Sequence, residues 1–120
     1  MNKEELQQRM KAFAIRVIRM VDKMPNSISA NAIAKQIVRS GTSPAANYRA
    51  ACLAKSEKDF LNKLKMVEEE LDETKFWLEI IMETEMLPAN KLQDLHSECH
   101  ELLKIVVSSI TTARNKINNQ

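Results

Sequence analysis

The sequence contains a single glycine, only three prolines and few aromatic residues. A β-sheet protein needs repeated tight turns, and glycine and proline supply many of them. Alanine, leucine, methionine, lysine and glutamate, which favour helices, are common instead. A chain of 120 residues has room for one domain with one continuous core. The composition therefore predicts a single all-α domain over residues 1–120.

The sequence also lacks a long apolar run and has only two cysteines. No stretch approaches the roughly 18 consecutive apolar residues of a membrane-spanning helix, and the first residues are polar and charged where a secretory signal needs an apolar segment. Cys52 and Cys99 stand far apart, and we expect them to be reduced thiols. We therefore expect a cytoplasmic protein without a membrane partner.

The charges are unevenly distributed along the chain. Residues 1–55 carry ten Lys or Arg and three acids, whereas residues 56–87 carry four Lys or Arg and ten acids. One interpretation is that a basic half lies beside an acidic helix, in the same subunit or across an interface. The alternative is that solvated faces differ in sign, because exposed ion pairs contribute little to stability.

Apolar residues recur at spacings of three and four in four segments, as they do on one face of an α-helix. The expected helices span about residues 4–24, 28–54, 57–85 and 90–115. Ser27 and Ser56 are predicted N-caps of the second and third helices, and Asn90 with Gln93 is a predicted capping box for the fourth. Short connections force successive helices to run antiparallel, which predicts an up-down four-helix bundle.

The second predicted helix contains a weak point at Pro44. Proline cannot donate a hydrogen bond to the carbonyl of Ser40, and it disfavours helical dihedrals at Ser43. Either one long helix bends between Ser40 and Pro44, or Ser43 caps a new helix with Pro44 in its first position. The residues alone leave both possibilities open.

The third predicted helix is apolar on two sides. Its expected core face consists of Phe60, Leu64, Val67, Leu71, Thr74, Leu78 and Ile81. Met66, Phe76, Trp77 and Ile80 project away from that face, because successive residues are rotated by about 100° around a helix. Large exposed apolar patches are rare on soluble monomers. We therefore expect these four side chains to form an interface between copies of the chain, in a homo-oligomer.

The first predicted helix carries a row of cations. Arg9, Arg16 and Lys23 recur every seven residues with Arg19 beside them, so their charges line up on one side. Clustered cations attract phosphates, which makes RNA or a nucleoprotein a candidate partner. Aromatic residues are too few to stack bases, so such binding would be mainly electrostatic. The alternative is an ordinary solvated helical face.

We find no glycine-rich phosphate loop and no nucleophile elbow, and we expect neither enzymatic activity nor a small-molecule substrate. The alternative function is metal binding inside the bundle. His96, Cys99 and His100 share one sector of the fourth helix and, with Cys52, could supply four zinc ligands. The Glu-x-x-His motif of di-iron bundles is missing, because neither histidine has a glutamate three residues before it. We expect no resident metal or cofactor.

Two carboxylates of the third helix are the remaining candidates for a polar site. Glu70 and Glu73 lie one turn apart on the side that also carries Trp77. Buried acids need partners, and Arg39 and Asn47 of the second helix are the expected ones. We therefore expect Arg39, Asn47, Glu70 and Glu73 to form a buried polar network.

Several motifs in the middle of the chain resemble one known pattern. They are Gln36-Ile-Val-Arg39-Ser40, Ser43-Pro-Ala-Ala-Asn47, Ala54-Lys-Ser56 with Asp59-Phe60 and Lys63-Leu64, and Glu70-Leu-Asp-Glu73-Thr74-Lys-Phe76-Trp77-Leu78. Over about residues 10–112 the chain resembles the four-helix bundle proteins associated with intervening sequences inside bacterial large-subunit ribosomal RNA genes. The resemblance implies a long second helix bent near Ser40 to Pro44, a ring-shaped homo-oligomer, commonly a pentamer, and no enzymatic activity.

The same family includes accessory proteins of diversity-generating retroelements, whose basic rings bind nucleic acid and a reverse transcriptase. That branch is typically much more basic than a chain with a pI of about 8.6, so the resemblance favours the general bundle family. Two positions depart from the family pattern. Ala50 stands where an acid usually follows the asparagine by three residues, and Pro44 stands where an aliphatic residue is usual.

Overall fold

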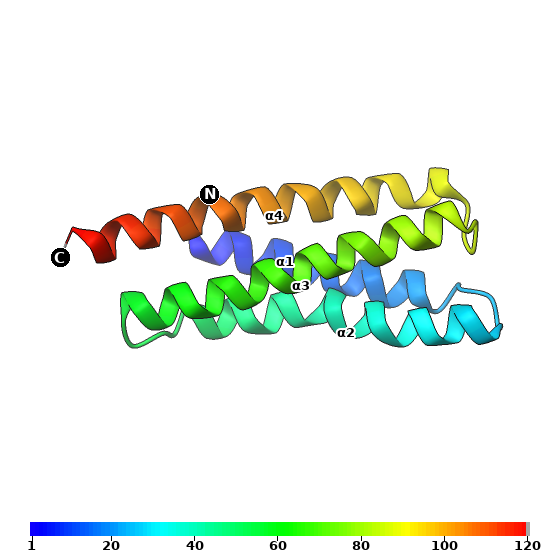
Figure 1. Cartoon of the computed structure of the whole chain (residues 1–120), viewed down its shortest axis with the longest axis horizontal. Helices are drawn as coiled ribbons and strands as arrows, with labels where there is room; N and C mark the ends of the chain where they lie inside the picture. The colour runs from blue at the N-terminus through cyan, green and yellow to red at the C-terminus, as the bar shows by residue number, and fades with distance from the viewer. Residues whose placement is uncertain (120) are drawn as a thin grey trace.

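The computed structural model describes residues 1–119, which form four helices joined by short loops. The helices are α1 (Lys3–Val21), α2 (Ile28–Ala51), α3 (Glu57–Glu83) and α4 (Ala89–Asn118). Successive helices run antiparallel and form a rod of 52 × 21 × 21 Å (Figure 1). The predicted all-α, up-down four-helix bundle is confirmed. None of the helices combines the length and apolarity that crossing a membrane requires, over the residues described.

The packing order of the helices places α1 and α3 diagonally across the bundle. Helix α2 packs closely against α1 and α3, and α4 packs closely against α3. The contact between α1 and α4 is much the smallest, so the seam between these two helices is the least closed side of the bundle.

The helix ends lie within three residues of the predicted ones. The hydroxyl of Ser27 accepts a hydrogen bond from the Ala30 amide at 3.1 Å, and that of Ser56 accepts one from Asp59 at 3.0 Å, so both predicted N-caps are confirmed. The predicted capping box of α4 is wrong. The N-cap of α4 is Pro88, which makes no side-chain bond, because its fixed φ starts the helix at the next residue and leaves Asn90 inside the first turn.

Helix α2 continues without a break through Pro44, which is buried. Residues 28–51 therefore form one helix rather than two. The bend between Ser40 and Pro44 stays a prediction. Packing against both α1 and α3 holds the helix together where its local sequence disfavours it. At Gly41 the two helices α1 and α2 come very close: a Cβ atom at this position would lie 2.7 Å from Cγ1 of Val17.

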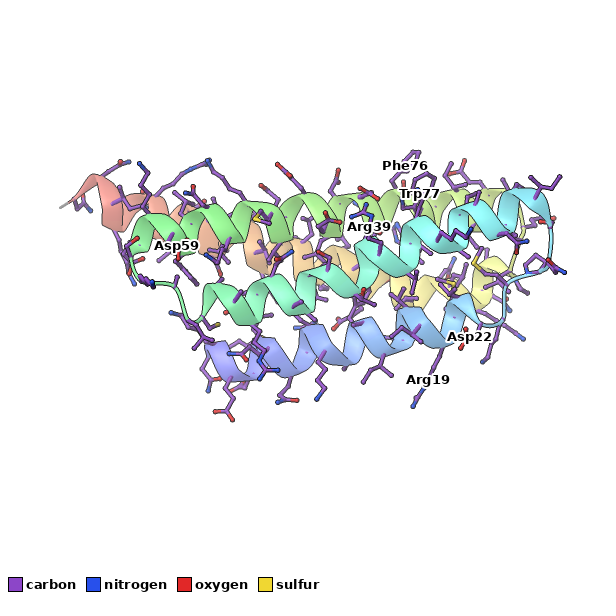
Figure 2. All side chains as sticks on the ribbon, turned by 90° about the horizontal axis from the view of Figure 1, so that it is seen from below. Arg19, Asp22, Arg39, Asp59, Phe76 and Trp77 are labelled. Atoms are coloured by element: carbon purple, nitrogen blue, oxygen red, sulfur yellow. The ribbon has the colours of Figure 1, made fainter. Side chains whose placement is uncertain are left out.

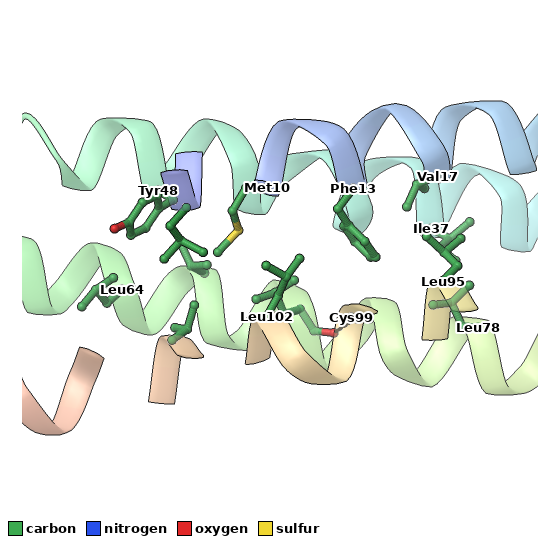
Figure 3. Packing of buried hydrophobic residues seen from close by; sticks show 14 of the residues in the cluster. Met10, Phe13, Val17, Ile37, Tyr48, Leu64, Leu78, Leu95, Cys99 and Leu102 are labelled. Carbon is green, nitrogen blue, oxygen red and sulfur yellow. Dashed lines mark hydrogen bonds between the residues drawn. The ribbon is translucent and has the colours of Figure 1, made fainter. Parts of the chain in front are cut away.

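The core consists of one buried row of side chains from each helix (Figure 3). Phe13, Ile37, Leu78 and Leu102, one from each helix, are almost completely buried. Two polar residues, Ser40 of α2 and Thr74 of α3, are also buried, and their hydroxyls form a hydrogen bond of 2.9 Å. The pair satisfies two polar groups that would otherwise be costly to bury.

Phe60 departs from its expected place in the core. Its ring is only half-buried, with Nζ of Lys3 lying 4.5 Å from the ring centroid, whereas the neighbouring Leu61 is buried. Phe60 lies in the first turn of α3, at one end of the rod, where fewer helices surround each position, and Leu61 follows it.

Candidate functional site

The apolar side chains on the second face of α3 are exposed in the single chain. Met66 is 49% exposed and Phe76 is 51% exposed, while Trp77 and Ile80 are partly exposed. The rings of Phe76 and Trp77 meet edge to face at a centroid distance of 5.0 Å and project together from the outer edge of α3 (Figure 2). We call Met66, Phe76, Trp77 and Ile80 the α3 patch.

A network of polar side chains borders the α3 patch. The guanidinium of Arg39 donates hydrogen bonds to Glu70 at 2.9 and 3.2 Å and to Glu73 at 2.5 Å. The indole of Trp77 donates to the same Glu73 oxygen that Arg39 contacts, at 3.1 Å. The hydrogen bond to Glu73 and the charges of both carboxylates raise the pKa of Arg39. This network fixes the orientation of the Trp77 ring within the patch.

The network lies on the surface, which corrects the prediction of a buried one. The side chains of Arg39, Glu70 and Glu73 are 51%, 23% and 35% exposed. The seam between α2 and α3 is filled by Ser40 and Thr74, the residues that follow Arg39 and Glu73. Because one residue turns the helix by about 100°, the charged side chains are placed at the rim of that seam.

Asn47 is not part of this network, contrary to the prediction. Its amide nitrogen donates to the hydroxyl of Ser43 at 2.8 Å, one turn earlier in α2. Asn47 follows Arg39 by eight residues, which corresponds to about 12 Å along a helix and puts it beyond the reach of the same carboxylates.

The four cations predicted for nucleic-acid binding divide into two groups. The guanidinium of Arg9 makes two hydrogen bonds of 2.7 Å with both oxygens of Glu98 on α4, so it is already paired. Hydrogen bonding to Glu98 raises the pKa of Arg9 against the opposing effect of burial. Arg16, Arg19 and Lys23 are exposed and take part in none of the ion pairs found within residues 1–119.

The three exposed cations line a groove of about 390 Å³ between the end of α1 and the start of α4, which we call the α1/α4 groove. Lys91 of α4 is a fourth cation in its lining, and the apolar side chains of Met20, Leu87, Pro88, Leu92 and Leu95 complete it. Lys91 was not predicted, because α1 and α4 are far apart in the sequence. The predicted antiparallel order of the helices could have revealed Lys91, because that order places the start of α4 beside the end of α1.

The side chains considered for metal binding are not brought together. Nε2 of His96 lies 2.8 Å from Glu79, and Nδ1 of His100 lies 3.2 Å from the amine of Lys75. Cys99 points into the core, where its thiol donates to the Leu71 carbonyl at 3.3 Å and burial raises its pKa to about 12. Among the residues described, no group of three or more His, Cys, Asp or Glu side chains, Cys52 included, is arranged to hold a metal ion.

The sequence matches the family model of the 23S rRNA-intervening sequence protein over residues 2–108. The chain belongs to this family. A similar solved structure is a Bacteroides thetaiotaomicron VPI-5482 protein of unknown function from the S23 ribosomal protein family, with 32% sequence identity and a TM-score of 0.85. The similarity covers 92% of this chain and 99% of the Bacteroides chain. The comparison with functionally curated proteins finds no match.

This member of the 23S rRNA-intervening sequence protein family has two candidate binding surfaces. The α3 patch is apolar and aromatic, and the α1/α4 groove is cationic with an apolar floor. Figure 2 shows Phe76 and Trp77 on one edge of the bundle and Arg19 on the other. Because α1 and α3 are diagonal in the bundle, a partner on the α3 patch leaves the groove accessible.

Proposed function

We propose that the chain is a non-enzymatic scaffold of the cytoplasm that assembles with copies of itself and binds RNA through the α1/α4 groove. The observation that carries the assembly is the exposure of the α3 patch, where Met66 and Phe76 are each about half-exposed and the Phe76 ring lies against that of Trp77. Covering such side chains is favourable at about 25 cal/mol per Å² of apolar surface. Free thiols at Cys52 and Cys99 suit a reducing compartment.

A ring of copies fits the distribution of apolar and charged residues better than a two-fold dimer. Helix α1 exposes Ile15 and Ile18, which are 39% and 43% exposed, on the side of the bundle diagonal to the α3 patch. A head-to-tail contact would place these isoleucines against the α3 patch of the next copy. It would bring the basic segment of residues 1–55 beside the acidic segment of residues 56–87. Repeated head-to-tail contacts close into a ring when the rotation between successive copies divides a full turn, and otherwise form an open filament. The family resemblance implies five subunits.

Assembly through the α3 patch is tested by Phe76→Glu. A buried charge facing apolar side chains is costly, so the variant is expected to run as a monomer in size exclusion with light scattering, while the wild type runs as a defined oligomer. The helical circular dichroism should not change, because Phe76 projects outward. Ile28→Glu is the matched control: Ile28 is 94% exposed at the start of α2, and its variant should keep the wild-type mass. A monomeric wild type at micromolar concentration contradicts the proposal.

The RNA half of the proposal is supported by the exposed cations of α1. Arg16 and Lys23 lie about a quarter turn or more around α1 from Ile15 and Ile18, so a ring contact does not require them, while Arg19 lies one turn after Ile15 between the two groups. In a ring, the cations of successive copies add to one extended field that attracts phosphates. Arg9 is excluded from this role, because Glu98 already holds its guanidinium.

RNA binding is tested by reversing the charge of Arg16 and Arg19 together. Each lost phosphate contact reduces the slope of log affinity against log salt by about one, so the double variant should lose about two units of slope and at least tenfold in affinity. The measurement is fluorescence anisotropy with a structured RNA hairpin at several salt concentrations. Arg9→Gln removes one charge from the same helix but should leave RNA affinity nearly unchanged. Absence of binding by the wild type at low salt would refute this half.

A further inference from the structure

The α1/α4 groove combines a cationic surface with an apolar one, whereas binding of phosphate alone needs only the cations. Arg16, Arg19, Lys23 and Lys91 supply four exposed cations from two helices. Between them lies an apolar floor, in which Leu92 and Leu95 are almost completely buried and Leu87 is partly exposed. Helix α4 also begins here without a side-chain cap, so its positive dipole end adds to the field of the cations. The ligand that fits is an anion with an apolar part.

The size of the groove limits that ligand to a small group. Its volume of about 390 Å³ lies in the range of pockets that hold single small molecules. Glu98, one turn after Leu95, pairs with Arg9 across the same seam and bounds the groove at that end. An acidic amphipathic helix needs a groove several turns long, with anchors at i, i+3, i+4 and i+7. The groove between this ion pair and the start of α4 is shorter than that.

We propose that the α1/α4 groove holds one unpaired nucleotide of an RNA strand, with its phosphates on the cations and its base against the floor of Leu87, Leu92 and Leu95. This inference rests on the proposed RNA binding and specifies its substrate. In a duplex the bases are stacked inside and expose only their edges, so no base face can lie against the apolar floor. In a single strand or loop a base can turn outward and stack on a guanidinium such as that of Arg16 or Arg19.

The test compares one labelled oligouridine, alone and annealed to oligoadenosine, by fluorescence anisotropy with the full chain. The single strand should bind at least about tenfold more tightly than the duplex at equal salt, because base and phosphate contacts act together. Leu87→Asn, which keeps the charge of the groove, should weaken single-strand binding about fivefold and leave duplex binding and the salt slope unchanged. Lys91→Gln should weaken both and reduce the salt slope by about one.

Two matched control variants and one measurement on the wild type keep this test valid even if a groove variant misfolds. Leu53→Asn changes an apolar side chain that is 80% exposed in another loop, and Arg114→Gln removes an exposed charge near the far end of α4, so neither should alter RNA binding. Photo-crosslinking of 4-thiouridine in the single strand to the wild type should label residues 87–95. This readout does not depend on any variant.

The outcomes separate the inference from the proposed function. If the duplex binds as tightly as the single strand, or if the crosslinks lie outside the groove, the nucleotide site is wrong while RNA binding stands. If neither RNA binds at low salt, the proposed RNA binding is wrong and the nucleotide site falls with it. Displacement of the oligouridine by an acidic amphipathic peptide of higher affinity would assign the groove to a protein partner and overturn the inference.

Discussion

Replacing Gly41 with alanine is expected to destabilise the bundle, although alanine is the better helix former. A Cβ atom at residue 41 would lie 2.7 and 2.9 Å from the two γ-methyl carbons of Val17 and 3.1 Å from its Cβ. Val17 is completely buried, and a valine in a helix has essentially one side-chain rotamer. No side-chain rotation relieves the contact, so α1 and α2 must move apart. Such overpacking costs about 1–3 kcal/mol.

The helix propensity of alanine offsets about 1 kcal/mol of this cost, so Gly41→Ala should lower the free energy of unfolding by up to about 2 kcal/mol. Gly41→Leu should cost more. The measurement is urea unfolding followed by circular dichroism, with Ala32→Gly at an exposed site of α2 as a measure of propensity alone. In a Val17→Ala background both γ-methyl contacts are removed and only the 3.1 Å approach to Cβ remains, so Gly41→Ala should be much less destabilising. Equal destabilisation in both backgrounds would show that contact with Val17 is not the cause.

The sequence predicted those features that depend on neighbouring residues in the chain. Apolar periodicity located four helices, and the serines before α2 and α3 marked their first turns, because a cap bonds to an amide only three residues away. The capping box of α4 failed for an equally local reason: Pro88 starts that helix two residues earlier than the box requires. Continuity at Pro44 was undecided, because it depends on packing against α1 and α3.

The helical period predicted on which side of its helix each functional side chain lies. It predicted neither how deeply the side chain is buried nor which residue of another helix it contacts. The helical period placed Glu70 and Glu73 one turn apart on α3, yet it could not tell that the small side chains of Ser40 and Thr74 fill the seam and leave the charges at its rim. Partners from distant segments were also missed. The pairing of Arg9 with Glu98 joins residues 89 positions apart, and Lys91 enters the α1/α4 groove through the same contact between α1 and α4.

Cys99 is buried, and we expect ionisation of its thiol to lower the stability of the protein in alkaline solution. Burial is the main cause that raises the pKa of this thiol to about 12 from its ordinary value of 9.0. Lys75 opposes the shift, and the carboxylates of Asp72, Glu79 and Glu98 reinforce it. Ionisation would also remove the proton that the thiol donates to the Leu71 carbonyl. The folded state therefore keeps a proton that the unfolded state releases above about pH 9.

Because the folded pKa is the higher one, the stabilising contribution is complete below pH 9 and is lost as the pH rises toward 12. The free energy of unfolding should fall by up to about 1.4 kcal/mol per pH unit in this window, to a total of about 4 kcal/mol. Urea unfolding between about pH 8 and pH 10, with a phosphine reductant, measures the first part of this slope. Cys99→Ala should flatten it, whatever the variant loses in baseline stability.

Tyr48 is a second buried group whose ionisation could contribute to the loss of stability. Its effect can be distinguished from that of Cys99 by the pH at which it begins. Burial, followed by the proximity of Cys52, raises the pKa of Tyr48 above its ordinary value of 10.0, so its effect begins about one pH unit above that of Cys99. Tyr48→Phe should therefore keep the wild-type slope between pH 9 and 10. A slope that survives in Cys99→Ala would mean that this thiol ionises as readily in the folded chain as in the unfolded one, which is incompatible with its place in the core between α3 and α4.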